Sequence, residues 1–141
     1  MTVRRIVCRI SAYVWAAPNT ALGLVAGLVL LCFGGRLTVV SGIAEFHGGL
    51  AGRFFAILPG PTHFGAMTLG HVILGVSQAG LSILREHEHV HVRQYERWGP
   101  FFLPAYGLSS AWHAAHGRRA YRDNCFEREA YALRGHQNPA D

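Results

Sequence analysis

The sequence predicts an α+β protein in which an N-terminal transmembrane helix precedes one small domain of short antiparallel strands and longer helices. Three observations indicate this fold class. No charged residue occurs from Ile10 to Gly35. Short runs of β-branched residues bounded by glycine then follow as far as residue 75, a pattern typical of strands. From Ser77 onward, the chain has the length and spacing of helices.

Composition limits the class of protein. The 141 residues are enough for one domain, and only 15% of them are charged, against about 25% in typical soluble domains, which favours contact with a lipid bilayer. All thirteen basic residues are scattered arginines without a nucleic-acid-binding motif, so we expect no nucleic-acid partner. Cys8, Cys32 and Cys125 form no CxxC pair, so they offer neither a disulfide framework nor a cysteine zinc site.

The uncharged N-terminal stretch is long enough to cross a bilayer, because about 20 residues suffice. We expect a helix over about residues 11–34 that either begins at Pro18 or is kinked there. A cleaved signal peptide is the alternative, but no small-x-small site follows Leu31. Arginines precede the span, which favours a cytoplasmic N-terminus. The protein is then expected in a bacterial inner membrane, with its remaining domain periplasmic or extracellular.

The chain divides into three parts. We expect a basic segment and anchor over residues 1–35, a metal-binding domain over 36–134 and a loose tail over 135–141. The predicted strands are two short ones between Arg36 and Gly49 about a Ser-Gly turn, and a third over Thr68–Gly75 that carries His71 at the sheet edge. The predicted loop between them is Pro59–Thr62.

Three helices are expected in the second half of the chain. Ser77 or Gln78 begins the first, and Gly99-Pro100 ends it after Trp98. The second covers Phe101–His116, with an interruption near Pro104, and its length suits a core or interfacial helix better than a membrane span. The third begins with either Asp123 or Asn124 as its N-cap.

The most informative motif is His87-Glu88-His89-Val90-His91, an HExxH pattern on the first of these helices. Residues four apart differ by roughly 40° around a helix, so His87 and His91 can share one cation. Glu88 lies about 100° away, where it is placed to act as a base on the attacking water rather than as a ligand. His89 is expected to face away from the metal. In an extended chain, however, His87, His89 and His91 would chelate together.

A catalytic zinc site needs a third protein ligand. Glu127 is the candidate, and Glu129, rotated by about 200° on the same helix, is the fallback. If Asn124 is the N-cap, Glu127 occupies the capping-box position and its carboxylate has a competing role; Asp123 as N-cap removes that competition. Gln94 is interpreted as a surface residue, with a role beside His91 as the alternative.

The HExxH motif followed by Glu127-Arg128-Glu129-Ala130, an ExxA sequence, resembles the gluzincin zinc metallopeptidases. The stretch from about Thr68 to Tyr131 is similar to small membrane-anchored bacterial members. The resemblance implies a zincin-like domain whose Zn²⁺ is held by His87, His91 and Glu127, with Glu88 as general base and an edge strand lining the peptide or protein substrate. Tyr131 stands where many relatives have Asp, so a carboxylate that orients the histidines is missing there.

The sequence therefore predicts a membrane-anchored zinc metallopeptidase that hydrolyses peptide bonds with an activated water. The alternative is a non-catalytic membrane protein that uses the His87/His89/His91 cluster to bind a metal for sensing or structure. The oligomeric state is not predicted.

Overall fold

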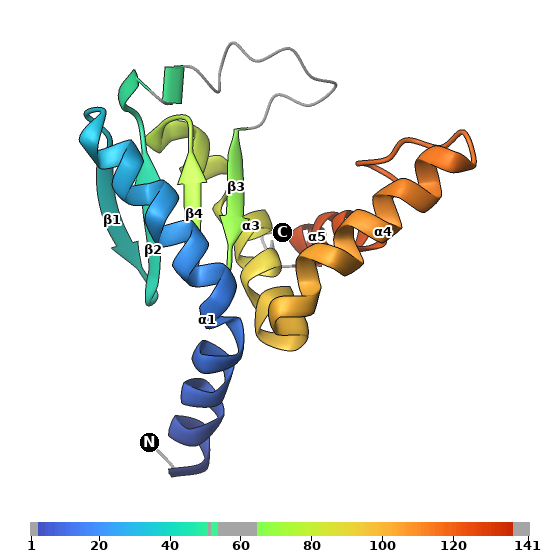
Figure 1. Ribbon diagram of the computed structural model, residues 1–141, viewed down its shortest axis with the longest axis horizontal. Helices are drawn as coiled ribbons and strands as arrows, with labels where there is room; N and C mark the ends of the chain where they lie inside the picture. The colour runs from blue at the N-terminus through green and yellow to red at the C-terminus, as the bar shows by residue number, and fades with distance from the viewer. Residues whose placement is uncertain (1–2, 51, 54–64, 137–141) are drawn as a thin grey trace.

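A computed structural model describes residues 3–50, 52–53 and 65–136. It has the α+β architecture expected, with a small mixed sheet between helices (Figure 1). The helices are α1 (Val3–Cys32), α3 (Gln78–Trp98), α4 (Phe102–Ala115) and α5 (Cys125–His136), with the 3-10 turn η1 (Gly99–Phe101); the strands are β1 (Arg36–Val40), β2 (Ile43–His47), β3 (Ala66–Leu69) and β4 (Val72–Gly75). The predicted loop 59–62 lies outside the described residues. So do residues 137–141 of the predicted tail, whose first two residues continue α5.

The strands lie in the order β1-β2-β4-β3. The two outer pairs are antiparallel as expected, but β2 and β4 are parallel, so the prediction of an all-antiparallel set is wrong at the centre. The predicted single strand Thr68–Gly75 is also wrong, because Gly70 has a φ of 62° and turns the chain between β3 and β4. His71 therefore lies in this turn and not on the edge strand.

Each face of the sheet is covered by a helix. Phe46 and Val72 pack with Leu30 of α1, whereas Ile43 and Ile73 pack with Leu81 and Val92 of α3 on the opposite face. Figure 1 shows α1 in front of the strands and α3 behind them. Successive residues of β2 and β4 thus alternate between the two layers, as a pleated strand requires. This arrangement holds α3, which carries the HExxH motif, against the inner face of β3 and β4.

Helix α1 confirms the predicted apolar helix, although it begins well before residue 11. It continues through Pro18, so the prediction of a start at Pro18 is wrong. Its axis changes direction partway along (Figure 1), the distortion expected where a proline removes a helical hydrogen bond. Its segment Val7–Cys32 is long and apolar enough to cross a membrane.

The domain lies beside α1 rather than beyond its end. Tyr13 donates a hydrogen bond to the carbonyl of Gly42 in the β1–β2 turn at 3.0 Å, and buried Asn19 donates to the carbonyl of Gly99 at 2.9 Å. Gly23 approaches the backbone of Leu69 so closely that an added Cβ would lie 2.9 Å from its carbonyl oxygen. Helix α1 therefore forms one wall of the domain, and the face of α1 that points away from the sheet is uncovered.

Local signals determine both ends of α3, as predicted. The Ser77 hydroxyl accepts a hydrogen bond from the Gly80 N–H at 3.1 Å, which caps the first turn. Gly99, with a φ of 54°, ends the helix where a residue with a Cβ would strike the Trp15 ring. The predicted interruption of α4 is wrong: Pro104 lies in the first turn of this helix, where a missing N–H leaves no intrahelical bond unmade.

The packing of α1 on the sheet is testable with two glycines. Gly23→Ala places a methyl group 2.7 Å from Val72 Cβ, so we expect it to destabilise the protein by about 1–3 kcal/mol through overpacking. Gly107→Ala in α4 meets no atom within 4 Å and should stabilise the helix by up to about 1 kcal/mol. Thermal unfolding in detergent measures both. Equal midpoints for the two variants would contradict the packing of α1 against β3 and β4.

Candidate metal centre

His87 and His91 point in the same direction from successive turns of α3, and Glu127 reaches them from the start of α5. The two histidine Nε2 atoms are 3.1 Å apart. Glu127 Oε2 is 3.2 Å from His87 Nε2, and Glu127 Oε1 is 3.4 Å from His91 Nε2. All three side chains are buried, and together they form a group that could bind a metal ion. The structure thus brings together the three ligands that the sequence analysis named.

The spacing of these atoms suits a small cation. Ligands held at roughly 2.0–2.1 Å in a tetrahedral shell are separated by about 3.3 Å, close to the separations of 3.1, 3.2 and 3.4 Å found here. Glu127 Oε2 is buried without a hydrogen-bond partner among the described residues. A cation between the carboxylate and the imidazoles would satisfy this oxygen, which is costly to leave unpaired.

Glu127 serves the histidines and not its own helix. Asn124 is the N-cap of α5, because its Oδ1 accepts a hydrogen bond from the Phe126 N–H at 3.0 Å. Of the two residues predicted as alternative N-caps, Asp123 does not fill this position, since its carboxylate binds Arg119 instead. Burial alone would raise the pKa of the Glu127 carboxyl, but the His87 and His91 imidazoles beside it hold that pKa well below its ordinary value. Glu127 is therefore an anion, the form that a metal requires.

Gln94 fixes the orientation of His91. Its amide nitrogen donates to the Phe126 carbonyl at 3.0 Å and to Glu129 Oε2 at 2.8 Å, both of which are acceptors. Its amide oxygen must then accept from His91 Nδ1, 2.8 Å away. This bond places the His91 proton on Nδ1 and leaves the Nε2 lone pair directed at the cluster. Gln94 is fully buried, so its interpretation as a surface residue is wrong.

His87 has no comparable support. Its Nδ1 atom is buried and has no hydrogen-bond partner among the described residues. The ring of Tyr131 packs against the His87 imidazole, with ring centroids 4.7 Å apart. Packing against Tyr131 therefore holds this ring, and the two histidines are oriented by different means.

Glu88 turns away from the two histidines toward the edge strand β3. The Thr68 hydroxyl donates to Glu88 Oε2 at 2.6 Å, and both side chains are buried. Burial raises the pKa of the Glu88 carboxyl, while the Thr68 hydrogen bond and the neighbouring histidines oppose that rise. A carboxylate with a raised pKa is suited to accept and return a proton. The structure thus separates Glu88 from the ligand group, as predicted.

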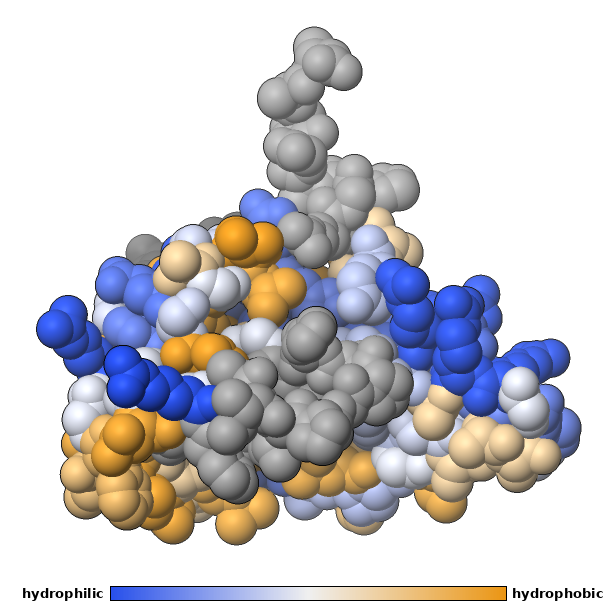
Figure 2. Space-filling view, turned by 90° about the horizontal axis from the view of Figure 1, so that it is seen from above, coloured by the Kyte–Doolittle hydropathy of each residue, from blue (hydrophilic) through white to orange (hydrophobic). Residues whose placement is uncertain are grey.

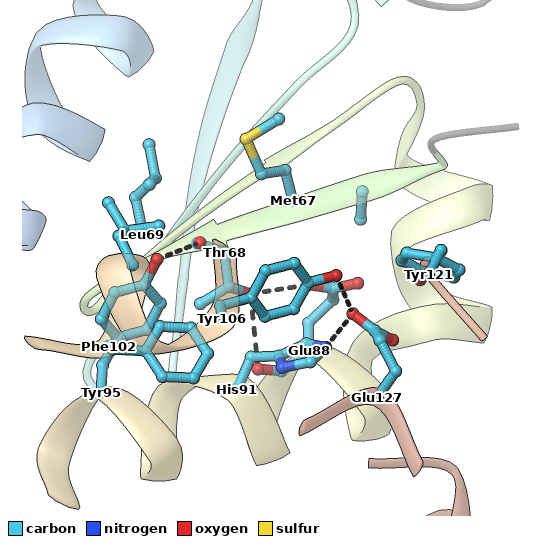
Figure 3. A pocket seen from close by; sticks show the side chains of 12 residues that line it. Met67, Thr68, Leu69, Glu88, His91, Tyr95, Phe102, Tyr106, Tyr121 and Glu127 are labelled. Atoms are coloured by element: carbon cyan, nitrogen blue, oxygen red, sulfur yellow. Dashed lines mark hydrogen bonds and ion pairs between the residues drawn. The ribbon is translucent and has the colours of Figure 1, made fainter. Parts of the chain in front are cut away.

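A cavity of about 210 Å³ lies in front of the cluster and Glu88. Figure 3 shows Glu88, His91, Glu127 and Tyr106 converging on it beneath strand β3. The Tyr106 hydroxyl donates to Glu127 Oε1 at 2.8 Å, and Tyr121 lines the same cavity. Burial, followed by the charge of Glu127, raises the pKa of both tyrosines, so both are neutral hydrogen-bond donors.

The remaining candidates lie outside the cluster. Glu129, the fallback ligand, accepts hydrogen bonds from Gln94 and Arg97. It is therefore connected to His91 through the side chain of Gln94. His89 faces away from the cluster, as predicted, and its Nε2 is 4.0 Å from the buried Glu45. Arg85, on the same helix as His89, forms a bidentate ion pair with Glu45 at 2.8 and 2.9 Å.

Sequence reasoning missed three residues of the site: Thr68, Tyr106 and Tyr121. Their positions follow from how β3, α4 and the α4–α5 connection fold over the cavity. No spacing relates a threonine or tyrosine in those segments to the HExxH motif, so the sequence carries no signal for them. Their hydroxyl groups can donate and accept hydrogen bonds, but this property alone does not assign them to a site.

Comparison of the chain with protein-family models, with curated proteins and with solved structures finds no match. The chain forms a mixed α+β domain that contains a buried His87–His91–Glu127 group able to bind a metal ion.

The role of Gln94 predicts a change in metal affinity. Gln94→Leu removes the acceptor from His91 Nδ1, and loss of such a supporting hydrogen bond typically weakens metal binding by roughly 10–100-fold. Competition with a chromogenic chelator measures the affinity for Zn²⁺. Gln78→Leu, at an exposed position in the same helix, is the matched control and should bind Zn²⁺ like the wild type. An unchanged affinity in Gln94→Leu would show that His91 needs no orienting partner.

Proposed function

We propose that this protein is a membrane-associated zinc metallopeptidase of gluzincin type, which hydrolyses peptide bonds with water. One observation carries the proposal: His91 and Glu127 of the buried ligand group border the same cavity as Glu88, so a substrate and a water molecule can reach both the ligand group and Glu88. A metal site that only stabilises a fold is closed by its protein ligands, whereas a catalytic site uses three of them and stays open.

The donor set supports zinc as the metal. Two neutral imidazoles and one carboxylate form the ligand combination of many catalytic zinc sites. His87, His91 and Glu127 would hold the ion. When bound, Zn²⁺ supplies Lewis acidity that lowers the pKa of water and polarises a carbonyl group.

The residues of the chain account for the proton transfers of hydrolysis. As the water oxygen bonds to the carbonyl carbon, Glu88 accepts a proton from the water. Glu88 then passes this proton to the amide nitrogen as the carbon–nitrogen bond breaks, which yields a carboxylate and an amine. Thr68 holds Glu88 in place for both steps. Tyr106 borders the cavity as a neutral donor and can stabilise negative charge that develops on the carbonyl oxygen.

The edge strand β3 provides a way to bind the peptide. It is last in the sheet order, and no strand among the described residues pairs with its outer edge. Residues Ala66–Leu69 line the cavity, and the backbone of this edge strand can pair with an extended peptide by strand addition. A peptide bound in this way would pass directly in front of Glu88 and the ligand group.

Glu88→Gln tests the proposal. It preserves shape but cannot accept a proton, so kcat/KM for peptide hydrolysis should fall by roughly 10²–10⁴-fold while one Zn²⁺ per chain is retained. Glu86→Gln, at an exposed position in the same helix, is the matched control and should keep full activity. Fluorogenic peptides measure hydrolysis, and elemental analysis measures zinc. Undiminished activity in Glu88→Gln would exclude Glu88 as the base, and a zinc-loaded wild type without hydrolysis would favour a non-catalytic metal protein.

A further inference from the structure

The cavity in front of the candidate metal centre is apolar apart from its reactive end. Among the described residues that line it, Glu88, His91 and Glu127 are the only acidic or basic ones. The opposite walls are formed by Met67 and Leu69 of β3 and by Phe102 and Leu103 at the start of α4. A charged side chain placed against these apolar walls would lose its hydration without gaining a partner there. An apolar side chain would be favoured by burial of its surface.

The size of the cavity indicates how much of a substrate it can hold. Its volume of about 210 Å³ is smaller than the roughly 300–1,000 Å³ of pockets that enclose a drug-sized molecule. It therefore suits one long aliphatic or aromatic side chain, with the rest of the peptide outside along β3.

The mouth of the cavity adjoins an apolar surface of the protein. Met67 is 42% exposed and Leu103 is 39% exposed, so both stand at the opening. Two residues before Leu103, the Phe101 ring lies 6.1 Å from the Trp15 ring of α1, and both rings are exposed. Exposed apolar side chains thus occur both at the cavity mouth and at the contact between η1 and α1.

The Phe101–Trp15 contact lies on the segment of α1 that is long and apolar enough to cross a bilayer. The cavity shares Leu69, Tyr95 and Phe102 with the core cluster that contains Ala16 of α1. Ala16 is seven residues beyond Arg9, or about 10 Å along a helix, and no charge follows Arg9 until Arg36. Seen from above, apolar side chains gather along the lower edge of the view, the side on which α1 covers the sheet (Figure 2). The exposed apolar side chains of α1, among them Val14, Val25 and Leu28, are free to contact lipid.

Building on the function proposed above, we infer that the substrate is an apolar segment of a membrane-associated polypeptide, and that one long apolar side chain next to the cleaved bond enters the cavity. The segment reaches the site from the bilayer along the Phe101–Trp15 surface and pairs with β3. Leu103 and Met67 at the mouth select the apolar side chain.

The test uses the zinc-loaded full chain in liposomes, together with a polypeptide that has an apolar segment between two polar flanks. Mass spectrometry maps the cleaved bonds. We expect cleavage in the apolar segment beside Leu, Met or Phe, and replacement of that residue by Asp should lower kcat/KM at least tenfold, as desolvation of the charge requires. Cleavage confined to the polar flanks, or insensitivity to the Asp replacement, would overturn this inference and leave the proposed function intact. No hydrolysis of any peptide would overturn both.

A variant at the cavity mouth gives an independent measure. Leu103→Arg should lower kcat/KM for the apolar substrate at least tenfold and reduce the preference for Leu over Asp, without loss of zinc, because Leu103 does not touch the ligands. Met67→Lys is the second variant if Leu103→Arg fails to fold. Leu133→Arg, at a leucine that is 40% exposed in α5 and does not line the cavity, is the matched control and should keep the wild-type preference. Equal preference in all three variants would contradict the selection at the mouth.

Discussion

The buried carboxylate of Glu127 is the interaction on which the site depends. A carboxylate that is only 3% exposed is stable as an anion only if donors or cations surround it. His87 and His91 meet it from one face of α3, and the Tyr106 hydroxyl meets it from α4. Three helices must therefore keep their relative positions for the carboxylate to remain charged. The same convergence creates the ligand group and leaves one side of it open to the cavity.

Helix α1 contributes to this geometry although it supplies no ligand. It covers the sheet face opposite α3, and its close approach at Gly23 positions the β3–β4 hairpin. Strand β3 in turn holds Glu88 through Thr68. The apolar helix thus has two roles: it presents an uncovered apolar face suited to lipid, and it supports the strand that orients the candidate base. Removing it as though it were a separate anchor would expose one side of the sheet.

Local chemistry made part of this fold predictable. Ser77 and Gly99-Pro100 set the ends of α3, and the helical spacing of His87 and His91 placed both on one face. The Thr68–Gly75 prediction failed because a continuous apolar run concealed the turn at Gly70. The functions of Thr68 and Tyr106 were not predicted, since each depends on a tertiary contact, with Glu88 and Glu127 respectively, and the role of Gln94 beside His91 was named only as the alternative. Glu127 was predicted from the need for a third ligand and its place at an expected helix start, to which the ExxA resemblance was added.

The most direct test of the central claim is the zinc content of three purified proteins measured under identical conditions: the wild type, Glu127→Gln and His89→Gln. The wild type should hold one Zn²⁺ per chain, Glu127→Gln should lose it on dialysis, and His89→Gln should retain it, because His89 faces away from the cluster. Retention of zinc in Glu127→Gln together with its loss in His89→Gln would contradict the account and assign the metal to the His87/His89/His91 cluster.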